Sequence, residues 1–156
     1  MTECSAGLSA KPREGLNTAM DDRDEFLEWF GTTWRAAEAA LYDGDPAPRS
    51  ATWSAQEPVT LFGASLSASG STRVRDVFRT LAASYSDVTS CTVELVTAEV
   101  RGDLAYTAHR EIIAMSVGGR PGEYVLRVTQ VYRREDGTWK VVHRHGDEER
   151  RTPAAS

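Results

Sequence analysis

The sequence is poor in features that define whole classes of protein. Its two cysteines, Cys4 and Cys91, lie far apart, so we expect neither a disulfide framework nor a cysteine-based zinc site, and a reducing cytoplasm fits best. No apolar run reaches the roughly 18 residues that a membrane span needs. Residues 1–20 also lack the apolar core of a secretory signal. These absences predict a protein that neither crosses nor binds a membrane.

The chain has no excess of basic residues either. Its 23 acidic and 18 basic side chains give a net charge of −5, which argues against a nucleic-acid partner bound by phosphate neutralisation. The length of 156 residues suits one domain with a substantial core. Residues 1–20 have no periodicity and many helix breakers, so they predict a disordered leader. Residues 148–156 predict a flexible tail, which leaves a single domain over residues 21–147.

Apolar residues at helical spacing predict two helices. The first covers residues 22–42, with an N-terminal cap expected from Asp22 and Glu25, and ends at Gly44, after which Pro46 and Pro48 should prevent a restart. A short irregular or helical piece is expected at about residues 50–54. The second covers residues 71–86. The expected buried stripes are Phe26, Phe30, Trp34, Ala37 and Leu41 on the first helix, and Val74, Val77, Phe78, Leu81 and Tyr85 on the second.

The second half of the chain changes to the alternation of β-strands. The pattern predicts four strands, at residues 92–100, 104–117, 123–134 and 138–146. Tight turns separate them, and Arg101-Gly102-Asp103 is the first of these turns. Consecutive strands joined in this way form an antiparallel meander. With a short strand at residues 58–63 and a loop at residues 64–71, the pattern predicts an α+β fold.

The order of these segments resembles a known family. Three segments carry the resemblance: the helix ending in Gly44-Asp45-Pro46, the strand Val59-Thr60-Leu61-Phe62-Gly63, and the closing Asp136-Gly137-Thr138-Trp139-Lys140-Val141-Val142-His143-Arg144-His145. Together they are similar to the SnoaL-like group, which is related to ketosteroid isomerase within the nuclear transport factor 2-like superfamily. The resemblance covers about residues 22–147. It implies a cone-shaped, strongly curved antiparallel sheet wrapped around the N-terminal helix, an enclosed pocket and usually a homodimer.

The resemblance does not extend to the steroid isomerases' catalytic groups. Those enzymes carry a carboxylate base on the strand after the first helix, where this chain has Leu61 or Phe62. Glu57 is the nearest carboxylate but precedes the strand, and Trp34 stands where the isomerases have a tyrosine. Steroid isomerisation by that set of residues is therefore not expected, and function must be argued from the pocket itself.

The strand residues 106–112 supply the favoured catalytic group. Alternation places His109 and Glu111 on one face, where they could form an oriented base, although the same spacing suits a solvent-exposed pair. Arg127, on the next strand, could donate to an anionic or carbonyl-bearing ligand, or could pair with Glu123 or Glu111 at the surface. We expect His109, Glu111 and Arg127 to act together.

Other side chains are expected to form the wall of the pocket. They are Trp34, Trp53, Phe62, Phe78, Tyr85, Thr129 and Arg144. For each aromatic residue, plain core packing is the competing interpretation. Strand parity sends Arg144 into the cone, opposite Trp139, Val141, His143 and His145, unless a β-bulge reverses the assignment.

His143 and His145 share a strand face and allow two interpretations. With His109 and Asp147 they could bind a metal ion, but packing at a dimer interface is favoured, so no metal and no other cofactor is expected. The expected homodimer would use the outer face of the sheet, with Val93, Leu95, Trp139 and Val141 as candidate contacts.

Two functions remain open on sequence grounds. The first is proton-transfer catalysis, of the isomerase, dehydratase or cyclase type, on a small apolar carbonyl or ring compound. The second is a non-catalytic ligand-binding or assembly domain, which the apolar Leu61 and Phe62 favour. Several polar groups converging in a closed pocket would favour catalysis, whereas a purely apolar cavity would favour binding.

Overall fold

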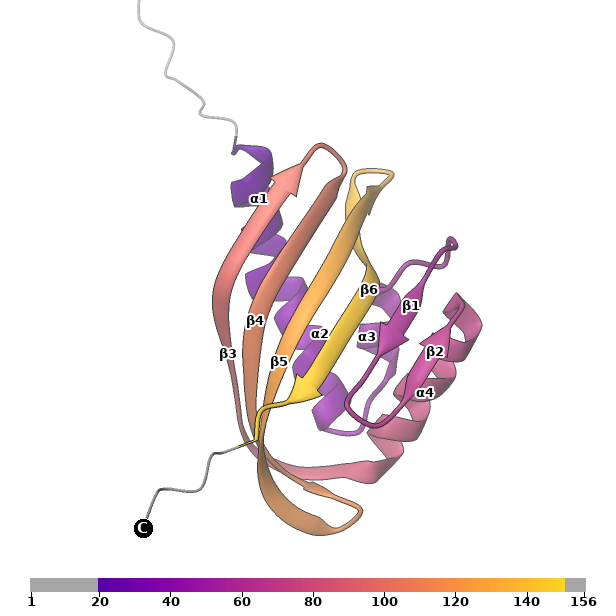
Figure 1. Ribbon diagram of the computed structural model, residues 1–156, viewed down its shortest axis with the longest axis vertical. Helices are drawn as coiled ribbons and strands as arrows, with labels where there is room; N and C mark the ends of the chain where they lie inside the picture. The colour runs from indigo at the N-terminus through magenta and orange to yellow at the C-terminus, as the bar shows by residue number, and fades with distance from the viewer. Residues whose placement is uncertain (1–19, 151–156) are drawn as a thin grey trace, which may run out of the picture.

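The computed structural model describes residues 20–150. Six strands form one strongly bent sheet in the order β2-β1-β6-β5-β4-β3, and the N-terminal helical segment lies across one face of it (Figure 1). This is the expected α+β architecture with a curved sheet around the first helix. The sheet is antiparallel except where β1 pairs with β6.

The first helix follows the predicted range. It consists of α1 (Asp22–Trp29), a π-helical segment η1 (Phe30–Trp34) and α2 (Arg35–Tyr42). The cap lies one residue earlier than expected, since the Asp21 carboxylate accepts a hydrogen bond from the Asp24 N–H at 2.7 Å. All five residues of the predicted stripe are buried: Phe26, Phe30, Trp34, Ala37 and Leu41.

A third helix, α3 (Ala47–Thr52), corrects one expectation. Pro46 and Pro48 do not prevent a new helix but lie at its beginning, where the missing N–H of proline leaves no hydrogen bond unmade. Gly44, with φ of 92°, provides the left-handed turn between α2 and α3. The restart matters because α3 carries Arg49 into the interior.

The segment between α3 and the meander forms β1 (Thr60–Phe62), β2 (Ser67–Ser69) and α4 (Ser71–Ser84). The expected loop at residues 64–71 thus contains a short strand, paired with β1. Val74 and Phe78 of the predicted α4 stripe are buried. Val77 and Leu81, by contrast, line a cavity. Tyr85 lines it too, but the predicted helix is too long, since α4 ends at Ser84 and Tyr85 begins the next strand.

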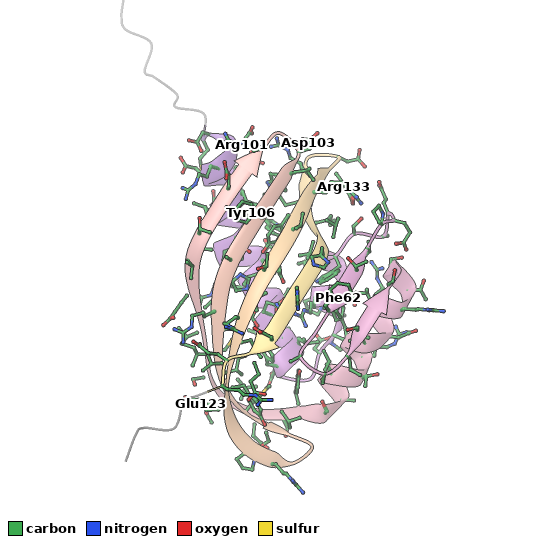
Figure 2. All side chains as sticks on the ribbon, in the orientation of Figure 1. Phe62, Arg101, Asp103, Tyr106, Glu123 and Arg133 are labelled. Atoms are coloured by element: carbon green, nitrogen blue, oxygen red, sulfur yellow. The ribbon has the colours of Figure 1, made fainter. Side chains whose placement is uncertain are left out.

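The meander consists of β3 (Tyr85–Arg101), β4 (Leu104–Val117), β5 (Arg120–Glu135) and β6 (Thr138–Glu148). Figure 2 shows Arg101 and Asp103 at the tip of the β3–β4 hairpin, the turn expected for this tripeptide. At the opposite end the β4–β5 hairpin curls beneath the rest of the sheet (Figure 1). This curl closes one end of the cone.

A β-bulge in β6 determines which side chains enter the cone. Tyr132 pairs with Val141 and Val131 with His143, so Val142 has no partner on β5. The extra residue shifts the parity of the strand. Trp139 and Val141 on one side of it and Arg144 on the other are therefore all buried.

The expected dimer contacts lie on the wrong face. Trp139 and Val141 are buried in the core. Val93 pairs with Glu111 and Leu95 with His109, so both share the helix-covered face with those buried side chains. The opposite face carries exposed Phe62 and Tyr106 (Figure 2). Dimerisation through the sheet stays a prediction, but these four residues would not carry it.

Most of the predicted leader and tail lies outside the described residues. Within them, Glu148 is the last residue of β6, and the Glu149 N–H donates to the Val125 carbonyl at 2.8 Å, so the start of the expected tail is part of the sheet. None of the helices formed by residues 20–150 has the length and apolar character needed to cross a membrane.

Candidate functional site

A cavity of about 430 Å³ occupies the end of the cone that the β4–β5 hairpin closes. It lies between α4, the ends of β4 to β6 and the loop joining β1 to β2. Its apolar wall includes Leu61, Leu66, Val77, Leu81, Met115, Val117 and Leu126. Polar side chains interrupt this wall: Tyr42, Arg49, Thr80, Ser84, Tyr85, Tyr124, Arg144 and Glu148.

Arg144 and Glu111 form a buried two-point ion pair beside the cavity. Arg144 Nη1 and Nη2 donate to the two carboxylate oxygens of Glu111, each at 2.8 Å. Nη1 also donates to Gln130 Oε1 at 3.0 Å, and Tyr42 donates its hydroxyl to Glu111 Oε2 at 2.8 Å. Glu111 is 1% exposed, so its charge is stabilised by protein groups rather than by solvent.

A chain of hydrogen bonds leads from this ion pair along the inner face of the sheet. His109 Nε2 lies 3.0 Å from Glu111 Oε1, and His109 Nδ1 lies 3.1 Å from the Thr107 hydroxyl. That hydroxyl is 2.8 Å from Tyr132 Oη, which accepts from Gln130 Nε2 at 2.6 Å. With a neutral imidazole, donation from Gln130 through Tyr132, Thr107 and His109 to Glu111 satisfies every member.

A second buried ion pair joins α2 to α3. Arg49 Nε lies 3.0 Å from Glu38 Oε1, and both side chains are almost fully buried. The other Glu38 oxygen is 3.9 Å from Arg144 Nη1, so the two ion pairs are neighbours. The Arg49 guanidinium also lies over the Phe78 ring, 4.8 Å from its centre.

The two buried carboxylates titrate in opposite directions. Burial raises the pKa of Glu38 above 4.5, and the nearby Glu111 charge adds to the rise, while Arg49 opposes it. Burial acts in the same sense on Glu111, but the charge and hydrogen bonds of Arg144, with the His109 bond, hold the pKa of Glu111 well below 4.5. Glu111 is thus the fixed anion of the pair, and Glu38 the carboxyl that more readily keeps its proton.

The lowered pKa of Glu111 predicts a loss of stability in acid. Its carboxyl binds a proton more readily in the unfolded chain, so its contribution is present above about pH 4.5 and is lost as the pH falls towards its folded-state pKa. Urea unfolding at pH 7, 5, 4 and 3 should show this decline. The Glu111→Leu/Arg144→Met variant, which has neither charge, should decline less, and equal pH dependence in both proteins would refute the prediction.

The structure brings two of the three expected catalytic residues together. His109 and Glu111 share the buried inner face of β4 and are hydrogen-bonded, but neither lines the cavity. Arg127 is not with them: its side chain is 60% exposed on the outer face, and its Nε donates to Asp147 at 2.9 Å. On β5 the buried positions are Val128, Gln130 and Tyr132, which leaves Arg127 with the outward parity.

Only two of the expected pocket residues, Tyr85 and Arg144, line the cavity. Trp34, Trp53 and Phe78 are buried in the core instead. Phe62 is 47% exposed between His143 and His145 on the outer face, and Thr129 is an exposed neighbour of His145 in the sheet. Successive residues of a strand point to opposite faces of the sheet, and Phe62 and Thr129 both occupy positions that point outward.

The alternative metal site does not form. His143 and His145 lie on the outer face beside Phe62, whereas His109 is buried on the inner face. Over residues 20–150, no three His, Cys, Asp or Glu side chains are grouped so that they could hold a metal ion.

Sequence reasoning missed Glu38, Tyr42 and Arg49. Glu38 is four residues from both Trp34 and Tyr42, so it lies on the buried stripe of the first helix. A charge at that spacing was the available signal, since burial of glutamate requires a partner. Arg49 follows Pro46 and Pro48 and precedes Ser50, and no apolar periodicity around it indicates that it is buried.

The model of the SnoaL-like domain matches residues 32–146 of the chain. The chain belongs to the SnoaL-like family. This confirms the resemblance drawn from the closing Asp-Gly-x-Trp segment. No curated protein sequence matches the chain.

Several solved structures share the fold. A candidate dehydratase of the NTF2-like family from Streptomyces avermitilis has 21% identity and a TM-score of 0.67, over 83% of this chain and 99% of that one. A ketosteroid isomerase-like protein from Erwinia carotovora atroseptica has 15% identity and a TM-score of 0.67, over 82% and 99%. A candidate calcium/calmodulin-dependent protein kinase type II association domain from Thiobacillus denitrificans has 20% identity and a TM-score of 0.63, over 76% and 93%. At these identities the likeness concerns the fold alone.

Proposed function

We propose that this SnoaL-like protein binds a small organic molecule in its cavity, with an apolar body against the wall and a polar end near the arginines. One observation carries the proposal: a cavity of about 430 Å³ combines a largely apolar wall with Tyr42, Arg49 and Arg144, all three buried. Ligand pockets in proteins have this size and this mixture of apolar surface with a few fixed polar groups. A site built only for packing would not retain a cavity of this volume.

A second function, proton transfer on a bound carbonyl or ring compound, is supported by the charges at the site. Tyr42 lines the cavity and its hydroxyl donates to Glu111, while Glu38 is a buried carboxyl with a raised pKa. Shifted groups of this kind suit acid–base chemistry. The names of the Streptomyces and Erwinia structures, a candidate dehydratase and a ketosteroid isomerase-like protein, agree with this class.

The two functions differ in what happens to a bound carbonyl compound in D₂O. Proton transfer at the carbon next to the carbonyl would exchange hydrogen for deuterium, and mass spectrometry would detect the added mass. Exchange that is lost in Tyr42→Phe would support catalysis through this hydroxyl. A ligand that stays bound with no change of mass would leave binding as the function.

Filling the cavity should abolish ligand binding without unfolding the protein. Leu81 is half-buried on α4 and faces the cavity, so Leu81→Trp places the indole in empty space rather than in packed core. We expect at least a tenfold loss of affinity for any ligand found by native mass spectrometry across a library of small carbonyl compounds.

The matched control is Leu104→Trp, because Leu104 is 54% exposed and does not line the cavity. This variant should bind as the wild type does. If Leu81→Trp folds and keeps wild-type affinity, the ligand binds elsewhere and the proposal is wrong.

A further inference from the structure

The two arginines on the cavity wall differ in how fully they are paired. Arg144 donates to both oxygens of Glu111 and to Gln130, so its charge and most of its N–H groups are occupied. Arg49 approaches one carboxylate oxygen, through Nε. Arg49 is therefore the cation on this wall that has donors to spare.

The spare donors of Arg49 are buried. The side chain is 3% exposed, and its Nε and Nη2 atoms have no hydrogen-bond partner among the described residues, although Nε is in ion-pair contact with Glu38. A buried guanidinium N–H without an acceptor is costly, and buried polar groups in proteins are normally hydrogen-bonded. Arg49 lines the cavity, so the acceptor can come from a molecule bound there.

The surroundings hold the guanidinium in a defined orientation. Its central carbon lies over the Phe78 ring, 4.8 Å from the ring centre, and its Nε atom forms an ion pair with Glu38 Oε1 at 3.0 Å. The terminal amino groups remain for a ligand. A planar fork of N–H donors fixed in this way matches the two oxygens of a carboxylate.

We propose that the ligand of this cavity carries a single carboxylate group, which is received by the terminal amino groups of Arg49. The inference deepens the proposed function and rests on it, since it specifies the class of molecule that the cavity takes. The rest of such a ligand would lie against Leu61, Leu81 and Met115 on the apolar wall.

The charges around the cavity favour one negative charge over two. Arg49 and Arg144 face the carboxylates of Glu38 and Glu111, and a further carboxylate, Glu148, lies on the cavity wall. Glu148 is exposed to solvent, which screens its charge, so the balance concerns the four buried groups. Among these four, a proton on Glu38 would leave one positive charge uncompensated, which a monoanion balances. A dianion such as a phosphate monoester would add a charge that nothing buried in the site offsets.

The test compares matched probes that differ only in charge. Benzoate, 2-naphthoate and octanoate are titrated by calorimetry at pH 7 against benzamide, 2-naphthamide and octanamide, with phenyl phosphate as the dianion. At least one carboxylate should bind tenfold or more tightly than its amide, and phenyl phosphate should bind more weakly than benzoate. Equal affinities within every pair, or tighter binding of phenyl phosphate, would overturn the inference.

Two substitutions in the ion pair should act in opposite directions. Arg49→Gln should reduce the affinity for the carboxylate at least tenfold and leave that for the amide unchanged. Glu38→Gln should tighten carboxylate binding several-fold at pH 7, because the neutral amide removes the need for Glu38 to take up a proton when the anion binds. A merely structural role of the pair would weaken binding in both variants and would contradict the proposal. Arg127→Gln, at an exposed arginine, is the matched control and should change neither affinity.

Three further outcomes distinguish a failure of the carboxylate inference from a failure of the proposed binding function. If Arg49→Gln does not fold, the double variant Glu38→Gln/Arg49→Gln, which leaves no unpaired charge, should bind carboxylate and amide equally, and a retained preference would refute the role of Arg49. If the wild type binds amides as well as carboxylates, the cavity is a binding site and only the carboxylate inference fails. If no probe binds, the proposed function fails with it.

Discussion

Replacement of Glu111 by glutamine should lower the free energy of unfolding by about 3–5 kcal/mol, the usual cost of removing one partner of a buried ion pair. The variant leaves Arg144, which is 5% exposed, without its two-point acceptor. It also exchanges a carboxylate that accepts from Tyr42 and His109 for an amide with one acceptor oxygen. Urea denaturation at pH 7 measures the loss as a lower midpoint at unchanged slope.

Two controls separate this ion pair from an ordinary one. Asp147→Asn breaks a similar two-point contact with Arg127, but at the exposed surface, and should leave the free energy of unfolding nearly unchanged. Glu111→Leu/Arg144→Met removes both charges and should cost less than Glu111→Gln alone, because no unpaired charge remains buried. If Glu111→Gln unfolds at the wild-type urea concentration, the ion pair does not support the fold.

The parts of the fold that follow from local periodicity could be predicted from the sequence. The stripe Phe26, Phe30, Trp34, Ala37 and Leu41 recurs at intervals of three or four residues, and every member is buried. The meander was equally predictable, because a glycine stands in each turn between two alternating segments. Gly102, Gly118 and Gly137 all adopt the positive φ that such hairpins require. The family followed from the same pattern.

The direction of single strand residues could not be predicted in the same way. Arg127 and Gln130 are both polar residues on β5, and the sheet itself decides which one points inward. In β6, the bulge at Val142 places Trp139, Val141 and Arg144 on one side, although simple alternation separates Arg144 from the other two. A bulge depends on pairing with a partner strand, so no local pattern reveals it.

The buried charges were harder still to predict. Glu38 and Arg49 are 11 positions apart on different helices, and each is an expensive residue to bury without the other. Only the tertiary structure brings them together, with Arg144 and Glu111 beside them. The site is therefore built from long-range ion pairs, whereas the sequence pattern reports on local packing.

Truncation of Trp34 to alanine should cost about 3–5 kcal/mol, as for other buried aromatic residues. Trp34 is fully buried, stacked on Phe30 at 4.3 Å and edge-on to His109 at 5.1 Å. Its indole Nε1 has no hydrogen-bond partner within the described structure, so Trp34→Phe loses volume but no hydrogen bond. That milder variant should cost much less than Trp34→Ala in urea denaturation.

Carboxylate binding by Trp34→Phe also tests whether Trp34 belongs to the core or to the ligand site. The resemblance to the isomerases places Trp34 where those enzymes have a tyrosine, yet Trp34 does not line the cavity. Trp34→Phe should therefore bind carboxylate probes with wild-type affinity, whereas Leu81→Trp should not. A loss of affinity in Trp34→Phe would mean that the ligand reaches past Arg49 to the aromatic core, and the site would have to be extended to include His109.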